Sequence, residues 1–416
     1  MKYVQNMVCL GCGEQYPVEP INVCEMCFGP LEISYDYMSM KNKVTRESIQ
    51  NGPPTIWRYI DFLPVNPDFI VDIGTGMTPL IKAKNLGKEL GLTNLYIKND
   101  GVNPTFSFKD RPVSITTSKA KEFGFEVLAC VSTGNLMGSV AAHGARANME
   151  TYVFYPNTLE KAKILQTSSY APTLIALEGT YDDANRFCTE LSDNNNWAFV
   201  NINMRAFYAE GSKTLGYEIA EQLDWQAPDH CIIPAASGEL VTKIWKGLQE
   251  FSEIGIISPP ENTQLHLAQA EGCSPIVQAF NNGTSEVKPV KPNTIAKSLA
   301  IGTPASGSFA IESLNQSHGT ATAASEASII ENIKLLARTE GIYTETAGGV
   351  VISVLQELVK QNKIQKDDLT VAFMTGNGLK TQEIFTDTIA EIKTSPKLKD
   401  FEKSLLEHKN KTLVST

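Results

Sequence analysis

The sequence predicts an α/β protein of two lobes with a crevice between them. From Phe125 onward, short apolar runs, turn residues and helical segments follow one another repeatedly, which is the pattern of strands alternating with helices. The chain of 416 residues is long enough for a large core divided into two packed lobes. In such proteins, ligands bind at the carboxyl ends of the strands.

Strands are expected where short apolar runs end in turn residues. These runs are residues 95–97, 127–131, 151–155, 173–177, 198–200, 230–234 and 369–374. Helices are expected at residues 140–147 with an extension back to 136, at 159–167, at 182–191 and from near residue 240. The runs between about residues 115 and 205 are expected to form the smaller lobe, nested within the larger one.

Composition excludes some classes of partner. The net charge of −10 argues against a nucleic-acid partner, which favours a basic surface. The sequence has no apolar run of membrane-spanning length and no apolar signal core before Cys9. Four of the eight cysteines are paired at metal-binding spacing, which fits a reducing compartment better than a disulfide framework. We therefore expect a cytoplasmic protein without nucleic-acid or membrane partners.

The first 34 residues carry two Cys-x-x-Cys pairs separated by eleven residues. Four thiolates at this spacing can surround one zinc ion in a zinc-ribbon-like segment. The expected zinc ligands are Cys9, Cys12, Cys24 and Cys27. A closed four-cysteine site has no open coordination position, so its role would be structural. The alternative is four reduced thiols in a ribbon that folds without metal.

Residues 103–111 read Asn-Pro-Thr-Phe-Ser-Phe-Lys-Asp-Arg. Ser107 and Asp110 have the spacing of a capping box, so a helix is expected to begin at Ser107. Lys109 then falls in the first turn, where the positive end of the helix dipole disfavours an ammonium group.

Phe106 and Phe108 are expected to exclude water from Lys109, which lowers its pKa further. A lysine near neutrality can form a Schiff base with an aldehyde, because only the free amine attacks. The alternative is an ordinary exposed lysine, with Asp110 and Arg111 as surface charges.

The regions flanking the main pattern are less regular. Residues 35–70 are polar and include four prolines, which indicates an irregular arm lying over the body. Residues from about 387 to 416 are charged, with Lys and Glu at helical spacing, and are expected to form a surface helix and a loose end.

The motif Asn-Pro-Thr-x-Ser-Phe-Lys-Asp-Arg resembles the lysine segment of threonine synthases, which are pyridoxal phosphate (PLP) enzymes of fold type II. The resemblance covers most of residues 8–380 and implies two lobes with twisted central sheets. It also implies that Lys109 is the residue to which PLP is covalently attached. The family usually has glycine after Asp-Arg, whereas this chain has Pro112, which the first turn of a helix tolerates.

Two further motifs are similar to the family. Ser132-Thr-Gly-Asn135 is expected between a strand and a helix, where free N–H groups suit an anion; on these residues alone an ordinary strand–helix turn fits as well. The resemblance implies that Asn135 contacts the PLP ring oxygen, while Ser132 and Thr133 hold the substrate carboxylate. In Thr-Gly-x-Gly-Leu-Lys, the hydroxyl of Thr375 is implied to face the pyridine nitrogen.

The loop after residues 230–234 corresponds by position to the glycine-rich loop of the family, whose N–H groups bind the PLP phosphate. The implied phosphate-binding residues are Ala236, Ser237, Gly238, Glu239 and Leu240. The loop departs from the family because Gly238 is its only glycine and Glu239 brings a negative charge, which must point away from the phosphate. Leu240 also replaces an asparagine that some members use.

Arg186 follows Gly179-Thr-Tyr-Asp-Asp, and in the family an arginine at this offset helps to bind the substrate phosphate. The alternative is a solvated charge on a helix face. Arg205 and Lys213 are nearby alternative cations for the phosphate. His143 is expected to be a packing residue and not a catalytic base.

The resemblance implies conversion of O-phospho-L-homoserine and water to L-threonine and phosphate, with PLP as cofactor, a small-molecule amino-acid substrate and a homodimeric assembly. The expected domains are residues 1–34, a catalytic domain at 35–400 and a tail at 401–416. A serine/threonine dehydratase or a sulfur-transferring β-replacement enzyme stays an alternative because of the altered loop. A zinc-ribbon binding protein with an inactive PLP domain is a more remote one.

Overall fold

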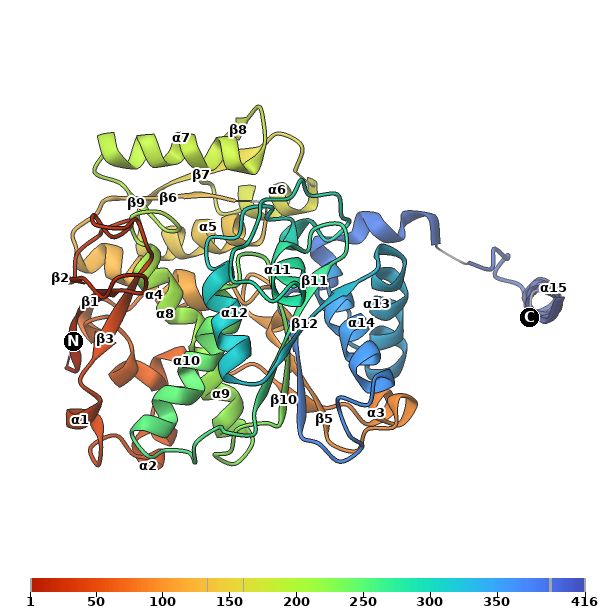
Figure 1. Cartoon of the computed structure of the whole chain (residues 1–416). Helices are drawn as coiled ribbons and strands as arrows, with labels where there is room; N and C mark the ends of the chain where they lie inside the picture. Colours follow the sequence, from red (N-terminus) through yellow and green to blue (C-terminus); the bar gives the residue numbers. More distant parts are fainter. Residues whose placement is uncertain (1, 133, 160, 389–390, 415–416) are drawn as a thin grey trace. The chain divides into compact units, whose positions relative to one another are not determined.

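The computed structural model describes residues 2–132, 134–159, 161–388 and 391–414. The chain forms two compact units, residues 1–381 and 382–416. The first unit contains three sheets (Figure 1). Among the described residues, none of the helices combines the length and the apolar character that a membrane crossing requires.

A six-stranded sheet forms the body of the first unit, in the order β12-β11-β10-β13-β5-β4. Its strands run parallel except for β4, which pairs antiparallel with β5. They are β4 (Leu80–Lys82), β5 (Leu95–Asn99), β10 (His230–Pro234), β11 (Gln264–Ala270), β12 (Thr320–Ala324) and β13 (Thr370–Met374). The central strand β10 is buried along its whole length, as continuous apolar runs in parallel sheets usually are.

The body helices cover both faces of this sheet, with α13 and α14 on one side and α9, α10 and α12 on the other (Figure 1). The α-helices of the body are α3 (Lys84–Leu90), α4 (Asp110–Glu122), α8 (Arg205–Ser212), α9 (Thr214–Gln222), α10 (Glu239–Glu253), α11 (Pro275–Asn281), α12 (Gly307–Gln316), α13 (Glu326–Glu340) and α14 (Thr346–Lys360). Short 3-10 turns are η3 (Asp100–Val102), η4 (Lys297–Leu299) and η5 (Gly378–Lys380).

The smaller lobe is a parallel four-stranded sheet in the order β8-β7-β6-β9. Helix α7 covers one face and α5 the other (Figure 1). The strands are β6 (Val127–Val131), β7 (Glu150–Pro156), β8 (Thr173–Leu177) and β9 (Ala198–Phe199), and the helices are α5 (Asn135–Ala147), α6 (Lys161–Ser168) and α7 (Tyr181–Asn194). The strands and helices expected here are confirmed, with ends that move by a few residues.

The N-terminal sheet is antiparallel, in the order β2-β1-β3. Its strands are β1 (Val4–Cys9), β2 (Gln15–Tyr16) and β3 (Leu31–Tyr35). It is part of the first unit, and Tyr35 Oη donates a 2.6 Å hydrogen bond to the buried carboxylate of Glu210 on α8. Lys213 pairs with that same carboxylate at 2.5 Å, so the ribbon is fixed to the body by buried charges.

The segment after the ribbon is more regular than the expected polar arm. It contains α1 (Tyr37–Met40), α2 (Arg46–Gln50), η1 (Ile56–Phe62) and η2 (Pro67–Phe69). Trp57 and Phe62 of η1 are buried, so apolar side chains hold this arm against the body. The second unit consists of η6 (Gln382–Thr388) and α15 (Leu398–Val414), which confirms a helix in the charged C-terminal region.

Candidate active site between the two lobes

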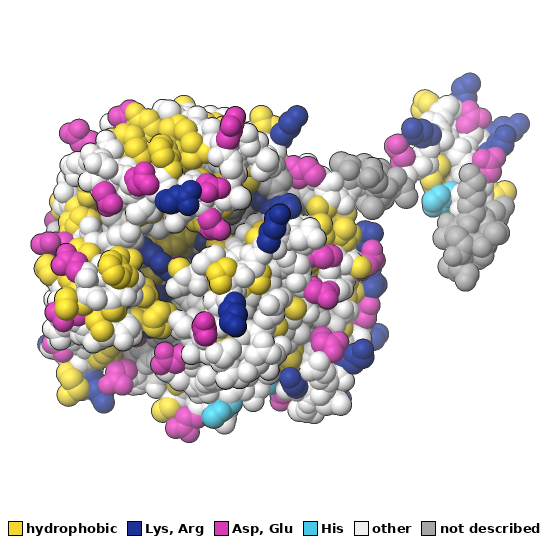
Figure 2. Space-filling view, turned by 45° about the horizontal axis from the view of Figure 1, so that its top comes forward, with side chains coloured by type: hydrophobic (Ala, Val, Ile, Leu, Met, Phe, Trp, Pro, Cys, Tyr) yellow, Lys and Arg dark blue, Asp and Glu magenta, His cyan; other side chains and the backbone are white. Residues whose placement is uncertain are grey.

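A cavity of about 250 Å³ lies between the two lobes. Its wall includes residues just beyond the ends of three strands: Ser132 directly after β6, Ala236 two residues after β10 and Thr375 directly after β13. Figure 2 shows a hollow in the middle of one face, with hydrophobic and Lys or Arg side chains inside it. The carboxyl ends of parallel strands are the usual place for a ligand in α/β sheets.

Lys109 lines this cavity. Burial lowers its pKa to about 8, while the carboxylates of Glu239 and Glu345 oppose this shift. Its Nζ lies 4.6 Å from the ring centre of Phe108 and donates a 2.5 Å hydrogen bond to Tyr208 Oη. The expected lowering of the Lys109 pKa is therefore confirmed, and burial is its main cause.

The predicted helix start at Ser107 is wrong, because α4 begins at Asp110 and Lys109 is the residue before it. Among the described residues, the carboxylate of Asp110 does not make the capping-box hydrogen bond with the N–H group of Ser107. It accepts hydrogen bonds from Thr105 N at 2.7 Å and Thr105 Oγ1 at 2.6 Å. Phe106 was expected to exclude water from the lysine, but it adopts a positive φ of 64° and is 40% exposed.

The two charges after the lysine are buried, so the alternative of surface charges is wrong. The guanidinium of Arg111 contacts Asp100 at 2.6 Å and Glu218 at 2.7 Å. Asp110 Oδ1 accepts a further 2.6 Å bond from Ser139 of α5. Buried charges need such partners, and this network fixes the backbone that carries Lys109.

Asn135 begins α5, and its side chain reaches across the cavity to the body. Its Nδ2 donates to the two carboxylate oxygens of Glu345 at 2.8 and 3.1 Å. Its Oδ1 is buried and has no partner among the described residues. A buried acceptor without a partner indicates a ligand or water in the complete site.

Ser132 caps the same helix, since its Oγ accepts hydrogen bonds from Gly134 N at 2.9 Å and Met137 N at 3.1 Å. Thr133, expected beside it, lies outside the described residues. Ser132 thus orders the turn that presents Asn135 to the cavity.

The loop before α10 also lines the cavity, through Ala236, Ser237, Gly238, Glu239 and Leu240. Gly238 has φ +91°, and a Cβ there would lie 2.8 Å from the carbonyl oxygen of Ser306, so glycine is required. No side-chain hydrogen bond caps α10 in the described part of the chain. The first N–H groups of a helix without a cap suit an anion.

Glu239, which was expected to point away from the phosphate, lines the cavity and pairs with Arg205. Its carboxylate lies 3.8 Å from Arg205 Nε, and Arg205 Nη2 also donates a 3.0 Å bond to Ser306 Oγ. The guanidinium therefore offsets the negative charge that Glu239 brings to the helix terminus.

Arg186 is not brought to the cavity. Its side chain is 72% exposed and pairs with Asp183 of the same helix at 2.9 Å. Lys213 is also outside the cavity lining, buried between Glu210 and Glu250. Arg205 is the member of the three expected cations that lines the cavity.

The cavity residues that the sequence reasoning did not assign as site residues include Tyr208, Glu345 and Ser298. Each lies in a segment that resembles the family, but the sequence assigns no chemistry to these positions. Ser298 Oγ is another buried atom without a partner among the described residues. His143 is fully buried, and its Nδ1 lies 2.9 Å from the carbonyl oxygen of Ser139, which agrees with a packing role.

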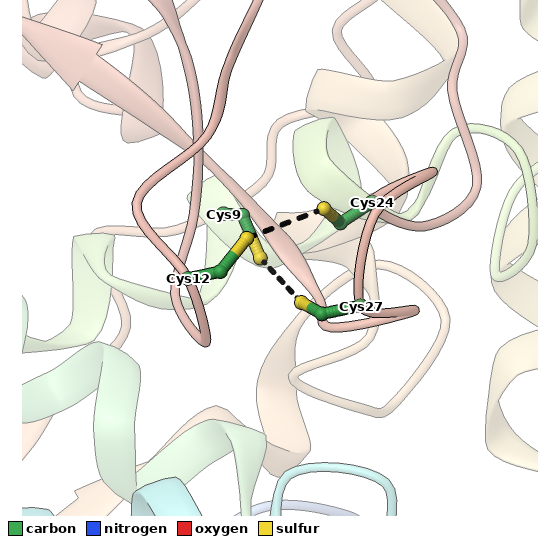
Figure 3. A group of neighbouring side chains, drawn as sticks. All are labelled: Cys9, Cys12, Cys24 and Cys27. Carbon is green, nitrogen blue, oxygen red and sulfur yellow. Dashed lines mark hydrogen bonds between the residues drawn. The ribbon is translucent and has the colours of Figure 1, made fainter.

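The four N-terminal cysteines converge from the two hairpin-like turns of the ribbon (Figure 3). Their sulfur atoms all lie within 4.8 Å of one another, with Cys9–Cys27 at 3.4 Å and Cys12–Cys24 at 3.6 Å. A tetrahedral zinc–thiolate site with bonds of about 2.3 Å has sulfur separations of roughly 3.8 Å. The donor set and its spacing therefore fit zinc.

The fold and the cavity define a two-lobed α/β enzyme in which a buried lysine with a lowered pKa and an uncapped helix terminus that suits an anion line the same cavity. Residues 71–376 match the family of pyridoxal-phosphate dependent enzymes. The chain belongs to this family, and its relatives place it among the threonine synthases.

The threonine synthase of Methanocaldococcus jannaschii is 40% identical over 377 residues, which are 89% of this chain and 92% of that protein. The threonine synthase of Methanosarcina acetivorans is 35% identical over 390 residues, or 93% and 95% of the two chains. Among solved structures, threonine deaminase isoform 2 from Solanum lycopersicum has a TM-score of 0.64 and 23% identity, covering 80% of this chain and 87% of that one. The last similarity concerns the fold.

Proposed function

We propose that this protein converts O-phospho-L-homoserine and water to L-threonine and phosphate. The observation that carries the proposal is Lys109, a buried amine with a pKa of about 8 that faces a cavity between the lobes. The threonine synthases that it resembles over about nine-tenths of its length support this substrate.

The residues present fit pyridoxal phosphate. The N-terminus of α10, with Gly238 free of a Cβ, would hold the phosphate. Asn135 and Thr375 would contact the ring, and Lys109 would bind the aldehyde. When bound, the cofactor supplies an electron sink for the carbon atoms of the substrate.

The side chains of the protein position the substrate and move its protons. The N-terminus of α5, ordered by Ser132, suits the substrate carboxylate. Arg205 is our candidate for the substrate phosphate, because charge-assisted hydrogen bonds to a guanidinium are strong. Lys109 in its free-amine form would remove the Cα proton and, once that proton has been released, would remove a Cβ proton. Phosphate leaves Cγ, water adds at Cβ, and protons return to Cα and Cγ.

Structural zinc in the ribbon is a separate proposal. The cluster of Cys9, Cys12, Cys24 and Cys27 supports it through donor type and spacing. The small lobe at about residues 115–205, the catalytic domain at 35–400, the homodimer and the cytoplasmic location stay predictions.

The function is tested by measuring phosphate release and threonine formation from O-phospho-L-homoserine by the purified protein supplied with PLP. Stoichiometric release of both supports the proposal. Ammonia release from serine or threonine instead would identify a dehydratase. Phosphate release from O-phospho-L-serine only with a sulfur nucleophile such as sulfide or sulfite would identify a β-replacement enzyme. Protein that binds no PLP would be the inactive form with a zinc ribbon.

A further inference from the structure

Tyr208 is the nearest polar neighbour of the lysine amine. It lies on α8, is 6% exposed, and lines the cavity. Its Oη accepts the 2.5 Å hydrogen bond from Lys109 Nζ. Within the described residues, its own hydroxyl hydrogen donates to no protein acceptor, so this hydrogen is available to a molecule in the cavity.

Arg205 lies three residues before Tyr208 on the same helix, and both side chains line the cavity. Residues three apart lie on one face of a helix. An oxyanion bound by the guanidinium of Arg205 would therefore lie on the side of the cavity that carries the phenol of Tyr208.

We propose that Tyr208 is a catalytic residue that passes a proton from Lys109 to the oxygen atom of the departing phosphate. The proposal rests on the proposed function and extends it, because it assigns the acid that assists the leaving group. Burial and the charge of Glu239 raise the pKa of Tyr208 well above its usual value, so the phenol keeps its proton until a strongly basic oxygen forms beside it.

The step balances. The free amine of Lys109 takes the Cβ proton, and the electron pair of that C–H bond becomes the second bond between Cβ and Cγ. The Cγ–O bond breaks, and its electron pair leaves with the phosphate oxygen. Tyr208 gives its proton to this oxygen and takes one from the Lys109 ammonium. The products are the unsaturated substrate and hydrogen phosphate, and both side chains return to their starting protonation states.

The first test compares two leaving groups in Tyr208→Phe. Phosphate needs a proton to leave as hydrogen phosphate, whereas sulfate is a weak base that leaves without one. We expect kcat for O-phospho-L-homoserine to fall by about 10²–10⁴-fold, the usual contribution of a placed acid, while sulfate release from O-sulfo-L-homoserine stays close to the parent rate. Both substrates are measured on one preparation, so any loss of folded protein cancels in their ratio.

Equal losses with both substrates, or no loss with phosphate, would overturn the relay. The matched control is Tyr155→Phe, a buried tyrosine of the small lobe outside the cavity lining, which should leave both rates unchanged. A parent enzyme that releases no phosphate from O-phospho-L-homoserine would instead contradict the proposed function, and with it the relay.

The second test uses PLP-free protein and needs no turnover. A hydroxyl oxygen that accepts a bond from Lys109 stabilises its ammonium form, so Tyr208→Phe should lower the pKa of Lys109 further. Glu239 and Glu345, which also act on this amine, stay in place. The readout is the pH dependence of amine labelling at Lys109, followed by peptide mass spectrometry with the exposed Lys41 as internal reference. An unchanged midpoint would show that the contact is absent in solution and would overturn the relay.

Discussion

Asn135 and Glu345 are 210 positions apart in the sequence, yet the amide nitrogen of one lies 2.8 and 3.1 Å from the carboxylate oxygens of the other. Both side chains line the cavity, and they belong to different lobes. The carboxylate also opposes the lowering of the Lys109 pKa by burial. The contact between Asn135 and Glu345 thus joins the two lobes beside Lys109, through a carboxylate that affects the Lys109 pKa.

The substitution Glu345→Gln should lower the pKa of Lys109 below about 8, because it removes a negative charge that favours the ammonium form. The side-chain oxygen of glutamine can still accept a hydrogen bond from Asn135 Nδ2. The acid limb of the pH–activity profile should move to lower pH, since more free amine is present there. Glu331→Gln, in an exposed pair on α13, is the control. A shift to higher pH would contradict this account.

Lys109→Ala should abolish both the visible absorbance of bound PLP and threonine formation, because the covalent attachment is lost. Lys380→Met is the matched control. Lys380 is also buried, with a pKa lowered to about 8 by burial, but it donates to Gln166 at 2.8 Å and lies outside the cavity lining. The control variant should keep the absorbance. A cofactor band that persists in Lys109→Ala would mean that another amine carries PLP.

Arg205→Gln should raise the KM for O-phospho-L-homoserine by roughly 10- to 100-fold, since a hydrogen bond to a charged group contributes about 1.5–3 kcal/mol. Arg186→Gln removes a cation that is 72% exposed and should change KM little. Steady-state kinetics of the two variants separates the candidates. A larger effect at Arg186 would mean that closure of the lobes brings its helix to the substrate.

The purified protein should contain about one zinc ion per chain, as a four-cysteine site predicts. Cys9→Ser should lose the metal and lower the melting temperature, because the ribbon would lose its central link. Cys273→Ala removes a buried cysteine outside the cluster and should keep the zinc. Metal analysis and thermal unfolding of the three proteins provide the test, and a metal-free parent would refute the prediction.

His266 should make the protein less stable in mild acid. Its Nδ1 lies 2.8 Å from Thr320 Oγ1, and its Nε2 lies 2.9 Å from His230 Nδ1. His230 Nε2 lies 3.0 Å from Asp368. Burial, together with the neighbouring His230, lowers the pKa of His266 to about 3. His266 is therefore neutral in the folded protein above that pH.

Since the unfolded chain binds a proton on this residue below about pH 6.5 and the folded chain does not, stability falls with decreasing pH, by about 1.4 kcal/mol per unit from this group. The loss ends near pH 3, where the folded state is protonated as well. Urea unfolding at several pH values gives the free energy of unfolding as a function of pH. This free energy should change less with pH for His266→Gln than for the parent. His318 is exposed, so His318→Gln should leave the pH dependence of the unfolding free energy unchanged.

Local sequence determined the strands well. The runs at residues 127–131, 173–177 and 230–234 coincide with β6, β8 and β10, because a strand in a parallel sheet must be a short apolar run between turns. The cysteine pairs likewise placed four thiols at one point. The family resemblance predicted that Lys109, Asn135 and Thr375 share one site, and the structure places all three in the wall of one cavity.

Tertiary contacts decided what local patterns could not. The sequence alone favoured a capping box at Ser107, but Asp110 bonds to Thr105 and to Ser139 on another helix. Arg186 and Arg205 were both reasonable phosphate ligands, and only the packing of α8 against the body selects Arg205 for the cavity. The partners of Lys109, which are Tyr208, Glu239 and Glu345, come from three distant segments. The sequence by itself singled out Lys109 as the candidate amine, whereas the folded chain determined its surroundings, because burial and charge at one atom depend on every segment that surrounds it.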